Sequence, residues 1–315
     1  MKEIGGYIEL DRYSLPMLHE GAVALNCGRN CLAYLIKARK IKKIAIPFFL
    51  CDSIQNVCER EDVQIRYYYL QENFMPEDIE LGADEWLYLV NYYGIISNHK
   101  IESFVDRYDR VIVDNAHAYY QTPIHDVDTL YTCRKFFGVA DGAFLYTNAG
   151  TLEGLDLDVS YNRMNYLLGR YEDKASRFYN EYVSNNKHFK DEPIKKMSRL
   201  TMNLLHAIDY ECVKEKRTQN FKFLNSVFRN QNNLKVELLD GAYAYPLWIE
   251  KGKEIRSILQ KNKIYIPTLW PGVIDKVSIH SREYEWVENI LPIPCDQRYD
   301  EKDLLYVVNM IQGLI

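Results

Sequence analysis

The stretch "VIVDNAHAYY" (111–120), followed by "CRKFFGVADGAFLYTN" (133–148), decides the fold that we expect. The first stretch begins with an apolar strand that ends on Asp114, and His117 follows three residues later. The second stretch places Lys135 beside two phenylalanines. In an open sheet of parallel strands, ligands bind beyond the carboxyl ends of the strands. We therefore expect Asp114 and Lys135 to meet at one edge of such a sheet.

Length and composition indicate an ordinary globular protein. The 315 residues suffice for one large domain or two of unequal size, and 47% of them are hydrophobic and 26% charged. The net charge of −5 and the lack of a basic run argue against a general nucleic-acid binder. No apolar run approaches the ~20 residues needed to span a bilayer, so we expect no membrane association and no signal peptide.

The seven cysteines indicate reduced thiols in a cytoplasmic protein, because they are odd in number and form no CxxC pair. Cys27 and Cys31 have no histidine nearby and make a poor zinc site. His125, Asp126 and Asp128 could suggest a metal, but a solvated loop before a strand is the favoured interpretation. We expect no metal site.

Apolar runs of strand length alternate with helical patterns in the first half of the chain. This alternation predicts an α/β fold with a mostly parallel sheet and helices on both faces. The expected strands are "KIAIPFFL" (43–50), "VQIRYYYL" (63–70), "WLYLVNYYG" (86–94), "RVIVDNA" (110–116), "TLYTC" (129–133) and "AFLYTN" (143–148). The expected helices between them are "CLAYLIKARK" (31–40), "SIQNVCERE" (53–61) and "IESFVDRY" (101–108).

The second half of the chain predicts a smaller unit. From about 153 to 232 the chain is polar and helical, and the pattern over 199–228 is long enough to link two domains. Apolar segments at 234–239, 243–250 and 264–269 and a closing helix at 301–314 then indicate an α+β unit. We expect a large domain over 1–205, and a linking helix with a small C-terminal domain over 206–315.

Asp114 and Lys135 are residue types that pyridoxal phosphate requires. The cofactor needs a lysine for a Schiff base, a carboxylate at its pyridine nitrogen and a cup for its phosphate. The carboxylate keeps the ring nitrogen protonated, so that the ring accepts the electrons released at a substrate carbon. An aspartate at a strand end and a lysine after the next strand could meet over one ring.

The segment "LNCGRNCLAYLI" (25–36) is a candidate for the phosphate cup. Gly28, Arg29 and Asn30 stand at the start of a helical pattern. A helix start presents free backbone N–H groups and the positive end of its dipole, which suit a phosphate. Thr132, three residues before the lysine, could reach the same phosphate with its hydroxyl.

Taken in order, these motifs resemble those of the DegT-type (DegT/DnrJ/StrS) sugar aminotransferases, which are pyridoxal phosphate enzymes of fold type I, with an aspartate-aminotransferase-like large domain. "VDNAHA" (113–118) resembles the family's Glu-Asp-Ala-Ala-His/Gln-Ala, and "GRNCLAYLI" (28–36) is similar to its Gly-Thr-Ala-Ala-Leu helix start. Further similar segments are "KIAIPFFLCDSI" (43–54), "VNYYG" (90–94), "RKFFGVADGAFLYTN" (134–148) and "LPIPCDQRYDEKDLLYVVNMI" (291–311).

The resemblance implies a role for each matching position. Lys135 matches the Schiff-base lysine, Asp114 the partner of the pyridine nitrogen, and His117 the residue near the ring's phenolic oxygen. The implied phosphate-binding positions are Gly28, Arg29, Asn30 and Thr132.

Two departures from the family pattern concern the cofactor site. Where the family has an aromatic residue stacking on the ring, this chain has Cys51, and we expect Phe49 to substitute for it. The family's Gly-x-Asn-x-Arg segment, whose asparagine reaches the phosphate of the partner subunit, is replaced by "KDEPIKK" (190–196).

The resemblance implies a homodimeric aminotransferase that takes an amino group from glutamate. The implied acceptor is a keto-sugar, usually nucleotide-linked, on the way to a polysaccharide or secondary metabolite. Two alternatives stay open. One is a sugar dehydratase of the same fold, although such relatives tend to replace the lysine that is intact here; the other is a non-catalytic relative that binds or regulates.

Single residues also have purely structural explanations. Lys135 could be a surface lysine between core phenylalanines, Asp114 a turn residue, and His117 the donor or acceptor of a structural hydrogen bond. Trp270, in "IPTLWPG" (266–272), could lie at the mouth of the site. The motifs taken together favour the cofactor roles.

Overall fold

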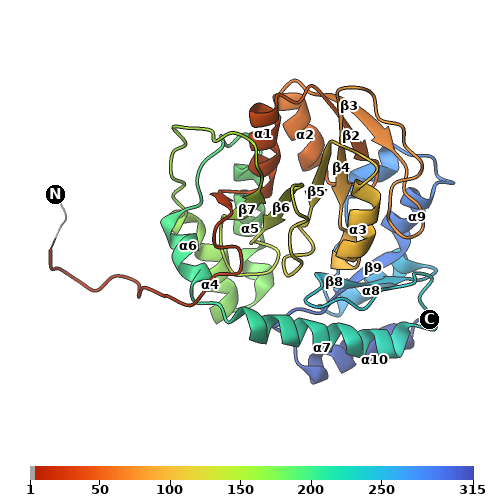
Figure 1. Cartoon of the computed structure of the whole chain (residues 1–315). Helices are drawn as coiled ribbons and strands as arrows, with labels where there is room; N and C mark the ends of the chain where they lie inside the picture. Colours follow the sequence, from red (N-terminus) through yellow and green to blue (C-terminus); the bar gives the residue numbers. More distant parts are fainter. Residues whose placement is uncertain (1–3) are drawn as a thin grey trace.

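The computed structural model, which describes residues 4–315, is built around a seven-stranded, mostly parallel sheet (Figure 1). The strand order is β1-β7-β6-β5-β4-β2-β3. Neighbours from β6 to β3 are parallel, whereas β7 pairs antiparallel with both β6 and β1. The strands are β1 (Val23–Leu25), β2 (Lys43–Pro47), β3 (Gln64–Tyr68), β4 (Glu85–Val90), β5 (Val111–Asp114), β6 (Asp128–Thr132) and β7 (Ala143–Tyr146). The predicted α/β fold is confirmed.

Each of the six strands expected for this sheet is present, and the sheet contains one further short strand that the sequence does not predict. Strands β4 and β5 are buried along almost their whole length, which explains why they read as continuous apolar runs. The unforeseen strand, β1, has only three residues, too few to show a period, and it pairs with β7 at the sheet edge.

The three expected helices of the first half are also present. They are α1 (Gly28–Arg39), α2 (Asp52–Arg60) and α3 (Asn98–Val105). Helix α1 buries seven consecutive residues, Asn30 to Ile36, and packs against β6 and β7. A short 3-10 turn, η1 (Tyr92–Gly94), follows β4 at the edge where the site lies.

The long helical patterns of the middle region are interrupted. The pattern over 165–183 forms α4 (Asn165–Glu172), the 3-10 turn η3 (Ala175–Phe178) and α5 (Tyr179–His188), after the 3-10 turn η2 (Tyr161–Arg163). The pattern over 199–228 divides into α6 (Arg199–Leu205) and α7 (Tyr210–Phe228). The Asp209 side chain accepts from the Cys212 N–H at 3.0 Å and so begins α7 with a new N-cap.

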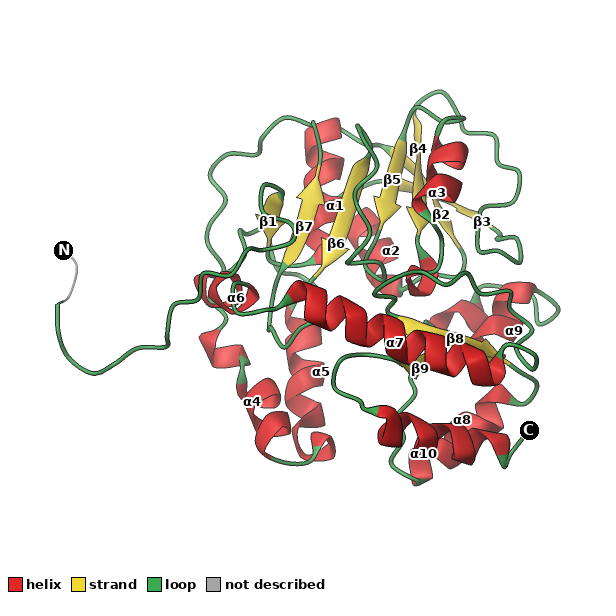
Figure 2. Ribbon diagram, turned by 60° about the horizontal axis from the view of Figure 1, so that its bottom comes forward, coloured by secondary structure: helices red, strands yellow, loops and turns green. Residues whose placement is uncertain are grey.

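The C-terminal part contains a two-stranded antiparallel sheet of β8 (Ala244–Trp248) and β9 (Ile290–Pro294). The apolar segments at 234–239 and 264–269 form no strand. The partner of β8 is β9, which contains two prolines. Figure 2 shows α7 beside this sheet. The remaining elements are α8 (Gly252–Lys261), the 3-10 turn η4 (Pro271–Asp275), α9 (Arg282–Asn289) and α10 (Glu301–Gln312). The division into domains at 205/206 stays a prediction.

None of the helices between residues 4 and 315 is both long enough and apolar enough to cross a bilayer.

Helix α9 is attached to the loop after β3 through one backbone position. The Glu283 carboxylate accepts from the Leu70 N–H at 2.9 Å, and Arg282 Nη1 donates to the Leu70 carbonyl at 2.6 Å. Glu283 is buried, and this burial raises the pKa of its carboxyl above the usual range. The carboxylate therefore supplies an acceptor at the expense of burying a charge.

Glu283→Gln is expected to unfold no more easily than the wild type near neutral pH, because the amide oxygen still accepts from Leu70 and no charge is buried. A raised pKa means that the stabilising effect of protonated Glu283 is present at low pH and is lost as pH rises through that pKa. The advantage of the Gln variant should therefore grow with pH in denaturant titrations. Glu283→Ala leaves the Leu70 N–H unpaired and should cost about 1–3 kcal/mol. A Gln variant as unstable as the Ala variant would contradict this account.

Candidate functional site

The candidate site lies at the carboxyl edge of the central strands. In the parallel register, Asp114 of β5 is opposite Val90 of β4 and Leu130 of β6. Because these strands run in the same direction, the loops that follow them emerge at one edge. Strand β1 is antiparallel to β7, which is antiparallel to β6, so the start of α1 lies at this edge as well.

Asp114 is a buried carboxylate with both oxygens hydrogen-bonded. The Tyr88 hydroxyl donates to Oδ2 at 2.7 Å, and the Ala116 N–H donates to Oδ1 at 2.7 Å. Burial raises the pKa of Asp114, while the positive charge of Lys135 and these two hydrogen bonds act in the opposite direction. Sequence reasoning missed Tyr88, because a tyrosine inside the run "WLYLV" indicates only a buried strand.

Lys135 and Asp114 lie close enough to act on each other electrostatically. The lysine side chain is accessible to solvent, yet the surrounding protein lowers its pKa, and Asp114 is the strongest group acting in the opposite direction. Lys135 Nζ lies 5.7 Å from the ring centroid of Tyr243. A lowered pKa leaves a larger share of the amine neutral, and a neutral amine is the nucleophilic form.

His117 has one ring nitrogen occupied and one available. Its Nδ1 accepts from the Tyr93 N–H at 3.1 Å, so in the neutral ring the proton is on Nε2. Burial, with the nearby charge of Lys135, holds the pKa of His117 well below its usual value. Nε2 has no hydrogen-bond partner among residues 4–315, so a neutral His117 presents an unused donor.

The turn that contains His117 touches the η1 turn at Gly94, where only glycine fits. Gly94 has a φ of +74°, and a Cβ there would lie 2.3 Å from the carbonyl oxygen of His117. Any larger residue would therefore push the η1 turn away from the His117 turn. The sequence "VNYYG" thus serves the site by allowing two loops to touch.

The C-terminal part contributes two rings to the site. The His117 ring lies parallel to that of Tyr243, at 4.3 Å and 13°, and to that of Trp270, at 5.8 Å and 8°. Trp270 has a φ of +55°, a backbone region that is costly for a bulky residue and that is found at functional sites. Its contact with substrate stays a prediction.

The start of α1 faces the end of β6. A Cβ built on Gly28 would lie 3.9 Å from Thr132 Cβ, so the predicted phosphate residues from two distant segments are neighbours. Gly28 and Arg29 are the first two residues of α1, so their N–H groups have no acceptor inside the helix. The start of a helix is a place where backbone N–H groups can bind an anion.

The prediction for Asn30 needs correction. Its side-chain amide donates to Asn26 Oδ1 at 3.0 Å and to the Pro193 carbonyl at 2.8 Å, and its backbone N–H donates to the Cys27 carbonyl. Because these groups are already used, Asn30 has no donor left for a phosphate. It holds α1 against the segment around Pro193 instead.

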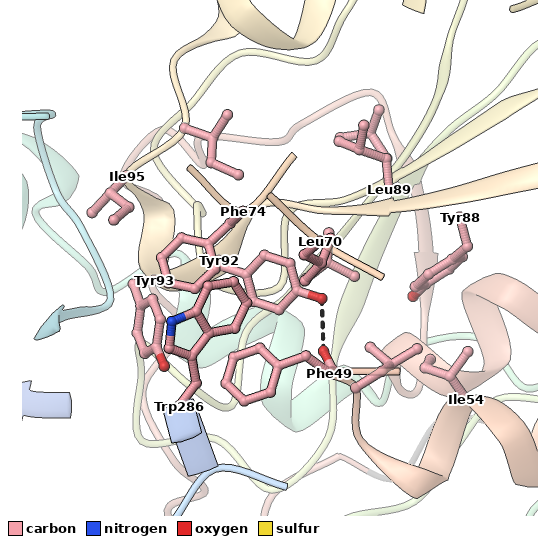
Figure 3. Packing of buried hydrophobic residues seen from close by; sticks show 14 of the residues in the cluster. Phe49, Ile54, Leu70, Phe74, Tyr88, Leu89, Tyr92, Tyr93, Ile95 and Trp286 are labelled. Atoms are coloured by element: carbon pink, nitrogen blue, oxygen red, sulfur yellow. Dashed lines mark hydrogen bonds between the residues drawn. The ribbon is translucent and has the colours of Figure 1, made fainter. Parts of the chain in front are cut away.

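The prediction that Phe49 stacks on a cofactor is wrong. Phe49 is 0% exposed, and its ring packs among Phe74, Tyr92 and Trp286, as Figure 3 shows. Its carbonyl accepts from the Tyr92 hydroxyl at 2.6 Å. No face of the ring is left for a ligand. Half-buried Cys51 is the residue of this loop that acts electrostatically on Lys135.

His125 and Asp126 precede β6, and Asp128 is its first residue. Asp128 is buried and accepts from Arg39 at 2.8 and 3.0 Å, whereas His125 and Asp126 are exposed. A separate group, Asp158, His188 and Glu192, borders a cavity of about 380 Å³. Asp158 pairs with Arg163 at 2.7 Å and Glu192 pairs with Lys195, so both carboxylates are already neutralised.

No family model matches the sequence, and no curated protein matches it either. The fold, however, is that of several solved aminotransferases. The sugar aminotransferase CalS13 from Micromonospora echinospora is 16% identical with a TM-score of 0.63, over 93% of this chain and 87% of that chain. A DegT DnrJ EryC1 StrS aminotransferase from Brucella abortus is 12% identical with a TM-score of 0.63, over 94% and 86%. NtdA from Bacillus subtilis, solved with pyridoxamine phosphate, is 13% identical with a TM-score of 0.67, over 93% and 73%.

Asp114→Asn is expected to lower the pKa of Lys135 further, because the negative charge that favours the ammonium form is removed. The pKa can be followed by NMR after reductive methylation with ¹³C-formaldehyde, with the signal assigned by its loss in Lys135→Gln. Asp128→Asn, which removes a buried carboxylate at the opposite end of β6, is the control and should leave the titration unchanged. An unshifted Lys135 titration in Asp114→Asn would mean that the two groups do not interact.

Proposed function

We propose that this chain is a pyridoxal phosphate-dependent aminotransferase of the DegT type that passes an amino group to a keto-sugar. The observation that carries the proposal is the pair Asp114 and Lys135, a buried carboxylate and a lysine of lowered pKa that act on each other at the sheet edge. The fold shared with aminotransferases supports the same assignment.

The residues present fit the cofactor. The first N–H groups of α1, at Gly28 and Arg29, with the neighbouring Thr132, would hold the phosphate. Asp114 would hold the pyridine nitrogen, and the unused Nε2–H of His117 would donate to the phenolic oxygen. When bound, pyridoxal phosphate supplies an aldehyde for covalent attachment and a ring that accepts electrons.

Lys135 has two tasks in this proposal. Its lowered pKa would provide the neutral amine that attaches the cofactor, and the same amine would carry a proton between the substrate carbon and the cofactor. Burial raises the pKa of Asp114, whereas Lys135, Tyr88 and the Ala116 N–H act in the opposite direction and favour its charged form. His117 stays a neutral single donor, since its lowered pKa prevents a second proton from binding.

The finer assignments rest on the resemblance and on the names of similar structures. We propose glutamate as the amino donor and a nucleotide-linked keto-sugar as the acceptor, in polysaccharide or secondary-metabolite biosynthesis. We further propose a cytoplasmic protein, which the unpaired cysteines support, and a homodimer, which rests on the resemblance.

Lys135→Ala is expected to abolish the visible absorbance that pyridoxal phosphate acquires when it is bound covalently to the protein, because the amine proposed to form that bond is removed. Lys253→Ala removes a lysine paired with Glu288 on the surface and is the matched control. The measurement is the absorbance spectrum after reconstitution and desalting. Retention of the band in Lys135→Ala would refute the assignment of this lysine.

Addition of glutamate to the reconstituted wild type should convert the bound cofactor to its amine form and release one equivalent of 2-oxoglutarate. Return of the original spectrum on adding a nucleotide-linked keto-sugar would support the acceptor class. Binding of the cofactor without any response to glutamate would favour the non-transaminating or non-catalytic alternatives.

A further inference from the structure

Two arginines that are far apart in sequence both donate hydrogen bonds to Asn186 of α5. Arg29, in the first turn of α1, donates through Nη1 to the Asn186 carbonyl at 3.1 Å. Arg134, the residue before Lys135, donates through Nη2 to Oδ1 of the same asparagine. One neutral residue therefore holds two positive groups beside the start of α1.

Neither arginine has an acidic partner within 4 Å in the described chain. Other half-buried arginines in this protein do; Arg39 pairs with Asp128 and Arg163 with Asp158, at 2.8 and 2.7 Å. In addition, Nε of Arg134 is buried and has no hydrogen-bond partner. Two like charges held side by side without a counter-ion are unfavourable, so their arrangement is best explained by an anion that binds there.

The charges of both arginines reach the site. The charge of each arginine acts to lower the pKa of Lys135 and, against the larger raising effect of burial, that of the thiol of Cys27, the N-cap residue of α1. The same place offers the free N–H groups of Gly28 and Arg29 and the positive end of the α1 dipole. Guanidinium groups bind phosphate through paired N–H donors, which a single lysine ammonium cannot present.

We propose that Arg134 and Arg29 form a clamp for the dianionic phosphate of a phosphomonoester at the start of α1. The identification of this phosphomonoester as pyridoxal phosphate rests on the proposed function. The segment "KDEPIKK" (190–196) lacks the asparagine with which the resembled family reaches the phosphate of the partner subunit. Arg134 supplies a charged donor from the chain that also carries Lys135.

The clamp is tested by comparing ligands with and without the phosphate. In the full-length chain, Arg134→Gln is expected to lower the affinity for pyridoxal phosphate on the order of 10- to 100-fold. This is the usual effect of losing a charge-assisted hydrogen bond. Pyridoxal, which lacks the phosphate, should bind to wild type and variant alike. Arg29→Gln should show the same phosphate-specific loss of affinity. Arg134→Lys keeps the charge without the paired N–H donors, so its affinity for pyridoxal phosphate should lie between those of the wild type and Arg134→Gln. Arg229→Gln, on an exposed arginine after α7, is the control.

A second measurement needs no cofactor. Inorganic phosphate, at matched ionic strength against chloride, should raise the melting temperature of the wild type and raise it less in Arg134→Gln. If the wild type does not bind pyridoxal phosphate but this phosphate effect depends on Arg134, the clamp stands and the proposed function fails.

Three results would overturn the clamp. One is an unchanged ratio of pyridoxal phosphate to pyridoxal affinity in both Gln variants. Another is an equal phosphate stabilisation of wild type and Arg134→Gln. The third is a loss of affinity in Arg134→Gln for UDP but not for pyridoxal phosphate, which would assign the arginines to a nucleotide diphosphate instead.

Discussion

The burial of the Asp114 carboxylate is the constraint on which the rest of the site depends. A buried charge is tolerated only when hydrogen bonds and an opposite charge surround it. Here Tyr88 and the Ala116 N–H occupy one lone pair on each oxygen, and Lys135 contributes the opposite charge. The parallel register of β4, β5 and β6 is what brings these three groups to one place. An antiparallel neighbour would have carried its loop to the other edge.

The loops around this carboxylate are held by close contacts and hydrogen bonds. Gly94 lets the turn after β4 touch the carbonyl of His117, and Tyr93 fixes the tautomer of the imidazole ring. The loop that carries Lys135 is held from the C-terminal part of the chain. Gln297 donates to the Phe136 carbonyl at 2.8 Å, and buried Arg217 of α7 donates to Gln297 at 3.0 Å. The lysine is therefore positioned by residues far from it in sequence.

The charges near Lys135 act in two directions. Asp114 favours the ammonium form, while desolvation of the amine by the surrounding protein, together with Arg29 and Arg134, favours the neutral amine. Desolvation is the largest of these effects, which explains the net lowering of the pKa. The two arginines that suit a phosphate also disfavour a positive charge on Lys135. The same residues therefore serve both the anion site and the neutral form of the amine.

What the sequence by itself determined is the local pattern: the alternation of strands and helices, Asp114 at a strand end, Lys135 after the next strand, and the helix start at Gly28. Periodicity and turn chemistry are properties of neighbouring residues, so they can be read along the chain. Only the tertiary structure decided that Phe49 is enclosed in the core, that the donors of Asn30 are used by the segment around Pro193, and that the Tyr88 hydroxyl meets Asp114. It also decided the pairing of β8 with β9 and the meeting of Arg29 and Arg134 at Asn186. These contacts join residues far apart in sequence, and which partners they find depends on how the elements pack, which no local pattern records.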